Sequence, residues 1–579
     1  MRTRWNAASK AVIVLLACFC ASIVTITRHG GLFGVSGSRS LLAQSRRPHT
    51  PDANFDLTRM GVLRYVMLEV NNNYVDPARV HPREMLLKGL DAIQRNVAQV
   101  LVRHDDGSNN VTVRVDTHEQ QFNIAGVNAP WDLEPKWREI FAFIQTHLRG
   151  TDVDLRDVEY VAANGMLHTL DPHSIVLTPE QYHEMQIQTG GHFGGLGIVI
   201  SIRDGLLTVM NPMPETPAAR AGLHRYDRIV KINDESTTNM SLSEAVNRLR
   251  GPENTPVSVW ITRAGQGGWT VPRRFDLTRA VINVRSVEHR LLPGGVGYAK
   301  IKSFSETTGD ELTRALAQMR QQGMRSFMLD LRGNPGGLLE QAVEVADLFL
   351  QDGTIVVTAG NRREGRDERE AQPRGTEPNY PVVVLIDGGS ASASEIVAGA
   401  LKNNNRALIV GSTSFGKGSV QTIRNLPDGG ALKITIAQYL TPGDVSIQGV
   451  GITPDVELAP MTVDRRDMDL DADRIFPREA DLSAHLTNTR ARGDQRAAQT
   501  LHYFFPYEER EQLRLRGADD LSDDGFREDY PVRFVREMLG ATSRAGRHEQ
   551  LADARPIVDH AQSDQVAAVA RALQAYQVN

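Results

Sequence analysis

Residues 381–421 read PVVVLIDGGSASASEIVAGALKNNNRALIVGSTSFGKGSVQ, and this stretch decides how the core of the chain folds. The continuous apolar run from Val382 to Ile386 is typical of a strand that is buried on both faces. An Asp-Gly-Gly sequence breaks this run, and apolar residues then recur at helical spacing from Ala391 to Leu401. The pattern therefore predicts a buried strand that turns sharply into a helix.

Three serines lie on this turn: Ser390, Ser392 and Ser394. The first N–H groups of a helix are unpaired there and favour negative charge. A second predicted strand, 406–410, leads to Lys417, which stands between two glycines. Hydroxyls at a helix start and one glycine-flanked lysine suit a serine–lysine nucleophile pair. The alternative is that the serines only cap the helix and the lysine is a solvated loop charge.

Two other chemistries are disfavoured in this stretch. No histidine occurs between His289 and His485, which excludes a Ser–His–Asp site confined to it. Residues 411–417 fit the phosphate-loop pattern up to its last position, where Gly418 replaces the Ser or Thr that binds Mg²⁺. The β-branched residues at 420–423 precede a turn and predict a hairpin, whereas a phosphate loop must open a helix.

A second glycine-rich corner precedes the serine corner in the same core. A buried strand at 326–331 runs into Gly-Asn-Pro-Gly-Gly, and a helix is predicted at 338–350. Alternating strands and helices with short turns predict a parallel α/β layer, in which the two corners can lie side by side. The N–H of Gly336 or Gly337 could then hold an oxyanion, although the sequence is also simply a good turn.

The composition is that of a multidomain globular protein. The chain has 579 residues, which implies roughly three or four domains. Its net charge is −5 with no sustained basic stripe, so nothing indicates nucleic-acid binding. The only cysteines, Cys18 and Cys20, lie in the N-terminal apolar segment. The folded part therefore has no disulfide, thiol nucleophile or thiolate metal site, and we predict neither a metal nor a cofactor.

The N-terminus carries an export signal or a membrane anchor. Basic residues precede the apolar segment 11–26, which is intermediate in length between a signal-peptide core and a full membrane span. We predict an anchor at 1–28 that is not cleaved, with the bulk of the chain exported to the periplasm and held at the inner membrane. Residues 29–55 are rich in Gly, Ser, Arg and Pro and are predicted to be a linker.

Two regions flank the expected domains. Residues 56–187 are predicted to be a helical N-terminal region with a polar insert at 104–128, which contains a short alternating strand at 111–115. His173 in this region is interpreted as a turn residue that bonds local backbone, rather than as a catalytic base. Residues 459–579 form a charged, partly helical C-terminal extension in which we find no chemical motif.

Residues 188–278 resemble a PDZ domain. The similarity rests on a glycine-dense opening, on Pro-Ala-Ala-Arg-Ala-Gly-Leu at 217–223 and on Asp-Arg-Ile-Val-Lys-Ile-Asn at 227–233. In that family the opening loop binds the terminal carboxylate of a peptide through backbone N–H groups. It corresponds here to four residues: Gly194, Gly195, Leu196 and Gly197. The alternative is a groove that is filled internally and only braces the fold.

The whole set of motifs, in this order, resembles the carboxyl-terminal processing peptidases, or tail-specific proteases. The resemblance spans roughly residues 57–454 and includes Gly-Met-Leu-His-Thr-Leu-Asp-Pro-His-Ser at 165–174. It implies an α+β multidomain protein: a ClpP/crotonase-like α/β serine protease core at 279–458, an inserted PDZ domain that is a small β-barrel or sandwich with two helices, and the helical N-terminal region. The polar insert and the C-terminal extension have no counterpart in this resemblance.

The resemblance also implies roles for individual residues. Ser392 would be the nucleophile, Lys417 its base, and Gln421 the residue that orients the lysine, while the backbone of Ala393 and Gly336 would bind the oxyanion. A lysine has an ordinary pKa of about 10.4, so a neutral amine at pH 7 needs a fall of roughly three units. We expect burial to supply it. The implied function is a serine endopeptidase that recognises protein C-termini and works through an acyl-enzyme.

Two other functions serve as alternatives: a PDZ scaffold with an idle core, and a nucleotide hydrolase that would need Mg²⁺. Expected partners are the C-termini of protein substrates and, through the N-terminal segment, the membrane. The sequence leaves room for an adaptor or activator protein and for an oligomer, and it specifies neither the natural substrate nor the cleavage preference.

Overall fold

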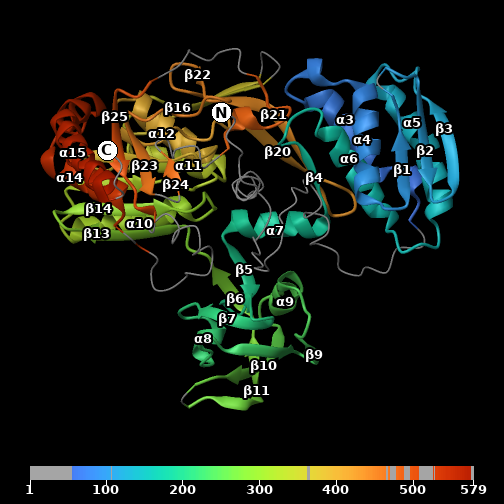
Figure 1. The fold of residues 1–579 in the computed structure, drawn as a ribbon, viewed down its shortest axis with the longest axis horizontal. Helices are drawn as coiled ribbons and strands as arrows, with labels where there is room; N and C mark the ends of the chain where they lie inside the picture. Colours follow the sequence, from blue (N-terminus) through green and yellow to red (C-terminus); the bar gives the residue numbers. More distant parts are fainter. Residues whose placement is uncertain are drawn as a thin grey trace.

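The structure is a computed structural model that describes residues 55–105, 107–265, 267–360, 365–464, 467–469, 477–487, 496–507, 526 and 528–575. The predicted anchor and all but the last residue of the predicted linker lie outside these ranges. Within them, no helix has both the length and the apolar character needed to cross a bilayer. Figure 1 shows a sheet-based core beside a helical N-terminal lobe, with a small β-rich domain below them.

The N-terminal lobe packs four helices against a three-stranded antiparallel sheet. Its elements are α3 (Gly61–Asn73), α4 (Pro82–Asn96), α5 (Leu133–Leu148), α6 (Leu155–Leu167), β1 (Val100–Arg103), β2 (Asn110–Val115) and β3 (His118–Asn123). The predicted strand in the polar insert is confirmed as part of β2. Alternate β2 residues, Val111, Val113 and Val115, are buried in the same core as the helices, so the insert is a structural part of this lobe.

Helices α4 and α6 cross closely at glycines. A Cβ atom on Gly165 would lie 2.5 Å from the Lys88 carbonyl oxygen and 2.6 Å from the Ala92 Cβ. We expect Gly165→Ala to lower the free energy of unfolding by about 1–3 kcal/mol, because the helices must separate to fit the methyl group. Chemical denaturation measures this loss. Gly540→Ala in α14 (Tyr530–Ala541) is the matched control, because a Cβ there meets no atom within 4 Å.

The β-rich domain has its own hydrophobic core. Its main strands are β6 (Ile198–Arg203), β7 (Leu206–Pro212), β8 (Arg228–Ile232), β10 (Pro256–Arg263) and β11 (Trp269–Thr278), with helices α8 (Pro217–Arg220) and α9 (Leu242–Leu249). The sheet order is β11-β10-β8-β7-β6, which leaves β6 at an edge among the described residues. Two short paired strands, β5 (His192–Gly195) and β12 (Ala280–Asn283), connect this domain to the rest of the chain beneath helix α7 (Pro179–Gly190).

The core of the chain is built on a mostly parallel sheet. Its strands are β13 (Val287–Leu292), β14 (Val296–Ile301), β15 (Ser326–Asp330), β18 (Val382–Ile386), β19 (Leu408–Gly411) and β23 (Val456–Asp464), in that order. All neighbouring pairs from β14 to β23 are parallel, as predicted for an α/β layer. Helices α10 (Thr308–Gln321), α11 (Leu339–Asp347) and α12 (Ala393–Asn403) cover one face.

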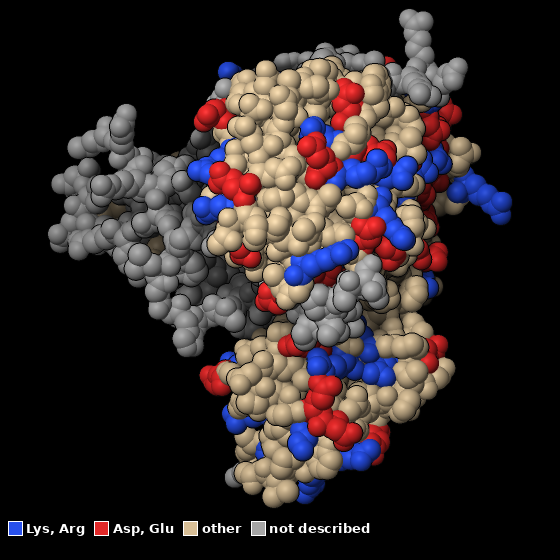
Figure 2. Space-filling model, turned by 90° about the vertical axis from the view of Figure 1, so that its right-hand side faces the viewer, with Lys and Arg blue, Asp and Glu red and all other residues tan. Residues whose placement is uncertain are grey.

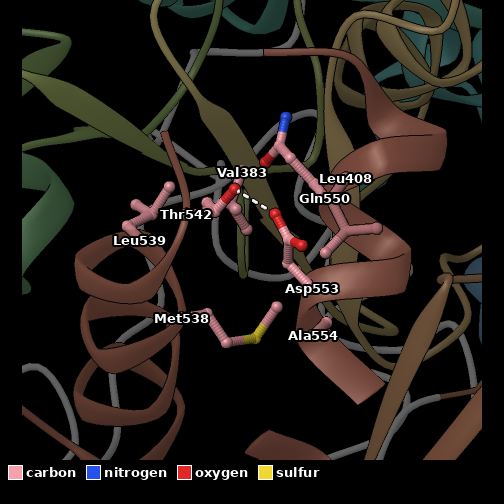
Figure 3. Close-up of a pocket in the computed structure, with 8 residues that line it drawn as sticks. All are labelled: Val383, Leu408, Met538, Leu539, Thr542, Gln550, Asp553 and Ala554. Atoms are coloured by element: carbon pink, nitrogen blue, oxygen red, sulfur yellow. Dashed lines mark hydrogen bonds between the residues drawn. The ribbon is translucent and has the colours of Figure 1, made fainter. Parts of the chain in front are cut away.

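The C-terminal extension covers the other face of this sheet. Val382, Val384 and Ile386 of β18 point into the core with α10 to α12, whereas Val383 and Leu385 point into a second core with α14 and α15 (Arg547–Ala575). Burial on both faces explains the continuous apolar run. Strand β25 (Gln499–Phe504) adds to the sheet parallel to β23. Figure 3 shows the small cavity where α14 and α15 meet the sheet. Two of its lining residues are joined by a hydrogen bond of 2.7 Å from the Thr542 hydroxyl to the Asp553 carboxylate.

A second sheet joins the core to the N-terminal lobe. It contains β4 (Ile175–Leu177), β16 (Thr354–Gly360), β17 (Arg366–Glu370), β20 (Ser419–Asn425), β21 (Ala431–Thr441) and β22 (Val445–Ser446). Strands β20 and β21 form the predicted hairpin, so a strand and not a helix follows Lys417, which is incompatible with a phosphate loop. On the face of the molecule in Figure 2, basic and acidic side chains are interspersed.

Candidate active site

The serine corner is a strained turn between β18 and α12. Ser392 is the residue before the helix and has φ 54° and ψ −112°, a conformation that is unusual for a residue with a side chain. The hydroxyl of Ser390 donates to the Leu331 carbonyl at 2.8 Å, and that of Ser394 donates to the Asn334 carbonyl at 2.9 Å. The Ser392 hydroxyl bonds none of the described residues. The structure therefore distinguishes one partly exposed serine from two that are fixed to the backbone.

The glycine corner lies directly against Ser392, as predicted for neighbouring parallel strands. A Cβ atom on Gly336 would lie 2.8 Å from the Ala391 carbonyl oxygen and 2.9 Å from the Ser392 Cβ. The N–H of Ala393, at the first helical position, donates to none of the described residues and is available for an oxyanion. The N–H of Gly336, however, donates to the Asn334 side chain at 2.9 Å. The prediction that the Gly336 N–H is free to bind an oxyanion therefore differs from the structure, because an Asx-type turn already provides this N–H with an acceptor. Gly337 is the glycine of this corner whose N–H bonds no described residue.

The buried carboxylate of Glu395 connects the serine corner to the lysine loop, residues 412–418, which carries Lys417 between β19 and β20. One oxygen accepts the N–H groups of Ser392 at 2.7 Å and Lys417 at 2.9 Å. The other accepts the Ser414 hydroxyl at 2.6 Å and the Gly416 N–H at 2.7 Å. Burial raises the pKa of Glu395 to about 7, although these four donors act in the opposite direction. A single ionisable group thus connects the nucleophile backbone to the lysine backbone.

Sequence reasoning gave Glu395 no role, although a usable signal was present. Glu395 follows Ser392 by three residues at the start of a predicted helix, which is the spacing of a capping box. In the structure, the carboxylate does accept the N–H of the residue before the helix. The remaining contacts come from a loop that follows the next strand, so local spacing does not predict them.

Lys417 is mostly buried, at 7% exposure. Its Nζ and the Ser392 hydroxyl are not hydrogen-bonded to each other in this structure, and Nζ bonds no other residue among those described. The Gln421 amide donates to the hydroxyls of Ser419 at 2.9 Å and Thr435 at 3.3 Å. The structure therefore brings Ser392, Gly336, Ala393 and the backbone of Lys417 together, whereas the Gln421 side chain is bound to other partners.

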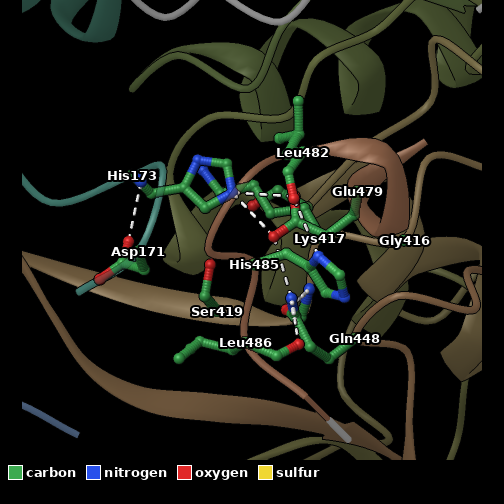
Figure 4. Close-up of polar contacts among 12 residues, drawn as sticks. Asp171, His173, Gly416, Lys417, Ser419, Gln448, Glu479, Leu482, His485 and Leu486 are labelled. Carbon is green, nitrogen blue, oxygen red and sulfur yellow. Dashed lines mark hydrogen bonds and ion pairs between the residues drawn. The ribbon is translucent and has the colours of Figure 1, made fainter. Parts of the chain in front are cut away.

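His173 has a partner that the sequence did not indicate. Its backbone N–H bonds the Asp171 carboxylate at 2.8 Å, as expected for a turn. Its ring does not bond local backbone. The Nε2 atom instead contacts both carboxylate oxygens of Glu479, at 2.8 and 3.0 Å, across 306 residues of sequence. Figure 4 shows this pair beside Lys417.

In the PDZ-like domain, the four residues predicted to bind a carboxylate lie at the end of β5 and in the connection that follows it. Gly194 and Gly195 belong to β5 and pair with β12. The N–H groups of Leu196 and Gly197, which connect β5 to β6, donate to none of the described residues. They lie immediately before β6, which is an edge strand among the described residues.

Comparisons with known proteins agree with this architecture. The family model described as peptidase family S41 matches residues 295–458, and the PDZ domain model matches residues 184–262. The carboxy-terminal-processing protease of Bartonella bacilliformis is 42% identical over 325 residues, which are 55% of this chain and 74% of that protein. The corresponding protease of Synechocystis is 42% identical over 307 residues, or 52% of this chain and 71% of that one.

Among solved structures, the photosystem II D1 C-terminal processing protease is 26% identical, covering 70% of this chain and 93% of that chain with a TM-score of 0.36. The family and PDZ matches define a serine-type peptidase that carries a PDZ domain. The chain belongs to peptidase family S41, among the carboxyl-terminal processing proteases. The predicted resemblance and the predicted fold class, a multidomain α+β protein, are confirmed.

Proposed function

We propose that the protein is a serine endopeptidase that binds substrates by their C-terminal tails and cleaves them with a Ser392–Lys417 dyad. The observation that carries the proposal is the state of the three corner serines. Two hydroxyls are bound to backbone carbonyls, and only that of Ser392 is free among the described residues. The Ser392 N–H also shares one Glu395 oxygen with the Lys417 N–H, so one carboxylate connects the backbones of the two residues.

The chemistry of this dyad is acyl transfer. The neutral amine of Lys417 takes the proton of the Ser392 hydroxyl as the oxygen attacks the peptide carbonyl. The N–H of Ala393 and a glycine N–H of the neighbouring corner stabilise the oxyanion. The ammonium then returns its proton to the leaving amine, and water hydrolyses the acyl-enzyme. The Nζ atom of Lys417 must move to reach the Ser392 hydroxyl. We propose that Gln421 orients the lysine during this movement.

Substrate tails would bind in the PDZ domain. The edge of β6 offers unpaired backbone groups for an added strand, and α9 lies across from it. The free N–H groups of Leu196 and Gly197 suit a terminal carboxylate. Ile198 and Ile200 are only partly buried against the domain core, so the groove favours an apolar tail. Delivery of the tail would also gate the dyad, because the PDZ domain is connected through β5 and α7 to the rest of the fold.

The remaining assignments rest on sequence alone. Residues 11–26 would anchor the chain in the inner membrane with the protease in the periplasm. An adaptor or activator protein and an oligomeric assembly fit this arrangement. The C-termini of exported proteins are then the substrates that such an enzyme would meet.

Tail recognition is tested with two versions of one unstructured substrate, which end in the same apolar residue as a free carboxylate or as a carboxamide. We expect kcat/KM for the carboxamide to be at least about tenfold lower, because the N–H groups of Leu196 and Gly197 lose a charged acceptor. A serine-directed fluorophosphonate identifies the nucleophile in parallel and should label Ser392. Equal cleavage of both substrates would contradict tail recognition, and labelling of another serine would contradict the dyad.

A further inference from the structure

The segment 477–487 of the C-terminal extension, which lies beyond the matched family region, is packed against the lysine loop (Figure 4). The N–H of Glu479 donates to the Phe415 carbonyl at 3.0 Å, two residues before Lys417. On the other side of the lysine, the Gln448 amide connects the segment to the loop. Its oxygen accepts the Gly418 N–H at 2.9 Å, and its nitrogen donates to the Glu479 carboxylate at 2.9 Å. The segment therefore holds the loop on both sides of the lysine.

The N-terminal lobe fixes the same segment from outside. Arg79 donates to the carbonyls of Ala484 and His485, both at 2.7 Å, and to the Leu170 carbonyl at 2.7 Å. The Leu170 carbonyl lies at the start of the turn that contains His173. The guanidinium of Arg79 therefore holds both the turn that carries His173 and the segment that carries Glu479, so other contacts of the fold support the contact between these two residues.

The carboxylate of Glu479 is a buried negative charge. Its side chain is 1% exposed, and that of His173 is 13% exposed. Burial lowers the pKa of His173, and the nearby charge of Lys417 lowers it further, so the ring is neutral and donates its Nε2–H. Burial alone would raise the pKa of Glu479, but the contact with His173, the hydrogen bond from the Gln448 amide and, last, the charge of Lys417 bring it below the usual value. The carboxylate therefore stays ionised beside the lysine.

We propose that Glu479 and His173 are positioning residues of the peptidase: a buried carboxylate–imidazole pair that holds the lysine loop and supplies the counter-charge for Lys417. This inference rests on the proposed dyad. When the lysine takes the serine proton, a positive charge forms on a mostly buried side chain. A fixed carboxylate nearby stabilises that charge without itself being protonated, which is the part that the aspartate has in a Ser–His–Asp triad.

Other charged groups near the pair come from three elements. Asp171 belongs to the same turn as His173, and Lys433 of β21 acts on the histidine through its charge. Arg478 and His485 belong to the segment itself, but both bond backbone carbonyls, those of Val450 and Leu482. Glu479 is thus the carboxylate whose oxygens are bonded to His173, and it lies beside Lys417 (Figure 4).

Glu479→Gln tests the proposal, with Asp481→Asn as the control. Both changes replace a carboxylate by an amide in one segment, but Asp481 is exposed and, among the described residues, accepts just the Arg478 N–H. We expect Glu479→Gln to lower kcat by about 10- to 100-fold with little change in KM, because the lysine loop loses its hold. The acid limb of the pH–rate profile should move to lower pH, because removal of a nearby negative charge favours the neutral amine. Asp481→Asn should retain the wild-type kcat and profile.

A second readout does not depend on turnover. In a Ser392→Ala background at fixed pH, we expect reductive methylation of Lys417 to be about tenfold faster with Glu479→Gln, because more of the amine is neutral. His173→Gln should show a smaller effect in the same direction. Thermal melting and binding of a tail peptide establish that each variant is folded.

The outcomes separate this inference from the dyad itself. If Ser392→Ala or Lys417→Ala still cleaves the substrate, the proposed dyad is wrong. The methylation rates of Lys417 with and without Glu479→Gln would still test whether Glu479 acts as its counter-charge. If both are inactive but Glu479→Gln keeps the wild-type kcat and profile, the positioning role alone is overturned. A raised kcat would show that the segment is inhibitory, and a lowered kcat with an unmoved acid limb would show a purely structural role. Each of these two results would overturn the proposal.

Discussion

Ser392→Ala is expected to abolish cleavage of an unstructured substrate with an apolar C-terminus, a loss of roughly 10⁴- to 10⁶-fold in kcat. The hydroxyl is the proposed nucleophile, and the oxyanion donors and the lysine cannot form an acyl-enzyme without it. Lys417→Ala should cause a loss of similar size, because the two residues act as a unit. Cleavage is followed by electrophoresis and by a fluorescent substrate, and tail-peptide binding by fluorescence anisotropy.

Ser394→Ala is the matched control for this loss. Its hydroxyl donates to the Asn334 carbonyl, which also accepts the Ala391 N–H. Removing it should cost about 1 kcal/mol of stability and leave labelling of Ser392 intact. All three variants should bind tail peptides like the wild type, because the PDZ groove is separate from the corner. Cleavage retained by Ser392→Ala would mean that another group is the nucleophile.

The two strand-to-helix corners could be predicted because local patterns determine them. Val382 to Ile386 is apolar at every position because both faces of β18 are buried, and the glycines at 336 and 337 have positive φ values of 103° and 150°. Neighbouring parallel strands then place both corners at the same edge of the sheet. Local sequence did not predict which of the three serines has a free hydroxyl. That depends on which serine hydroxyls lie close to backbone carbonyls of other segments.

The parts of the site that escaped prediction are contacts between distant segments. His173 and Glu479 are 306 residues apart, and the segment around Glu479 has no periodic pattern that would mark it as part of a site. The bonds of the Gln421 amide and of the Gly336 N–H depend on side-chain conformation, which sequence patterns do not encode. The packing of the C-terminal extension likewise depends on the pairing of β25 with β23, which a local sequence pattern does not predict.

Glu395→Gln is expected to have the second-largest effect on activity. Each carboxylate oxygen accepts two donors. In Glu395→Gln, the amide nitrogen replaces one of these oxygens and therefore faces the N–H of either Lys417 or Gly416. One buried donor is left unpaired, at a cost of about 1–3 kcal/mol in the free energy of unfolding. The serine corner and the lysine loop also lose their common acceptor, and we expect kcat/KM to fall by about 100-fold.

The control is Glu340→Gln, because Glu340 is an exposed acid in the first turn of α11, at the neighbouring corner. Chemical denaturation and steady-state cleavage should both show near-wild-type values for it. Wild-type activity for Glu395→Gln would contradict the coupling between Ser392 and Lys417 through this carboxylate.

The pH dependence of the Glu395 variant has a defined sign. Burial raises the pKa of Glu395 from 4.5 to about 7, so between these values the folded chain keeps a proton that the unfolded chain has released. The stability that this proton contributes is complete below about pH 4.5 and is lost as the pH rises through 7, a change of about 3 kcal/mol. The stability difference between wild type and Glu395→Gln should therefore narrow over this interval. A wild-type protein that loses stability between about pH 4.5 and 7, and a glutamine variant whose stability does not change over this interval, would identify Glu395 as the group responsible.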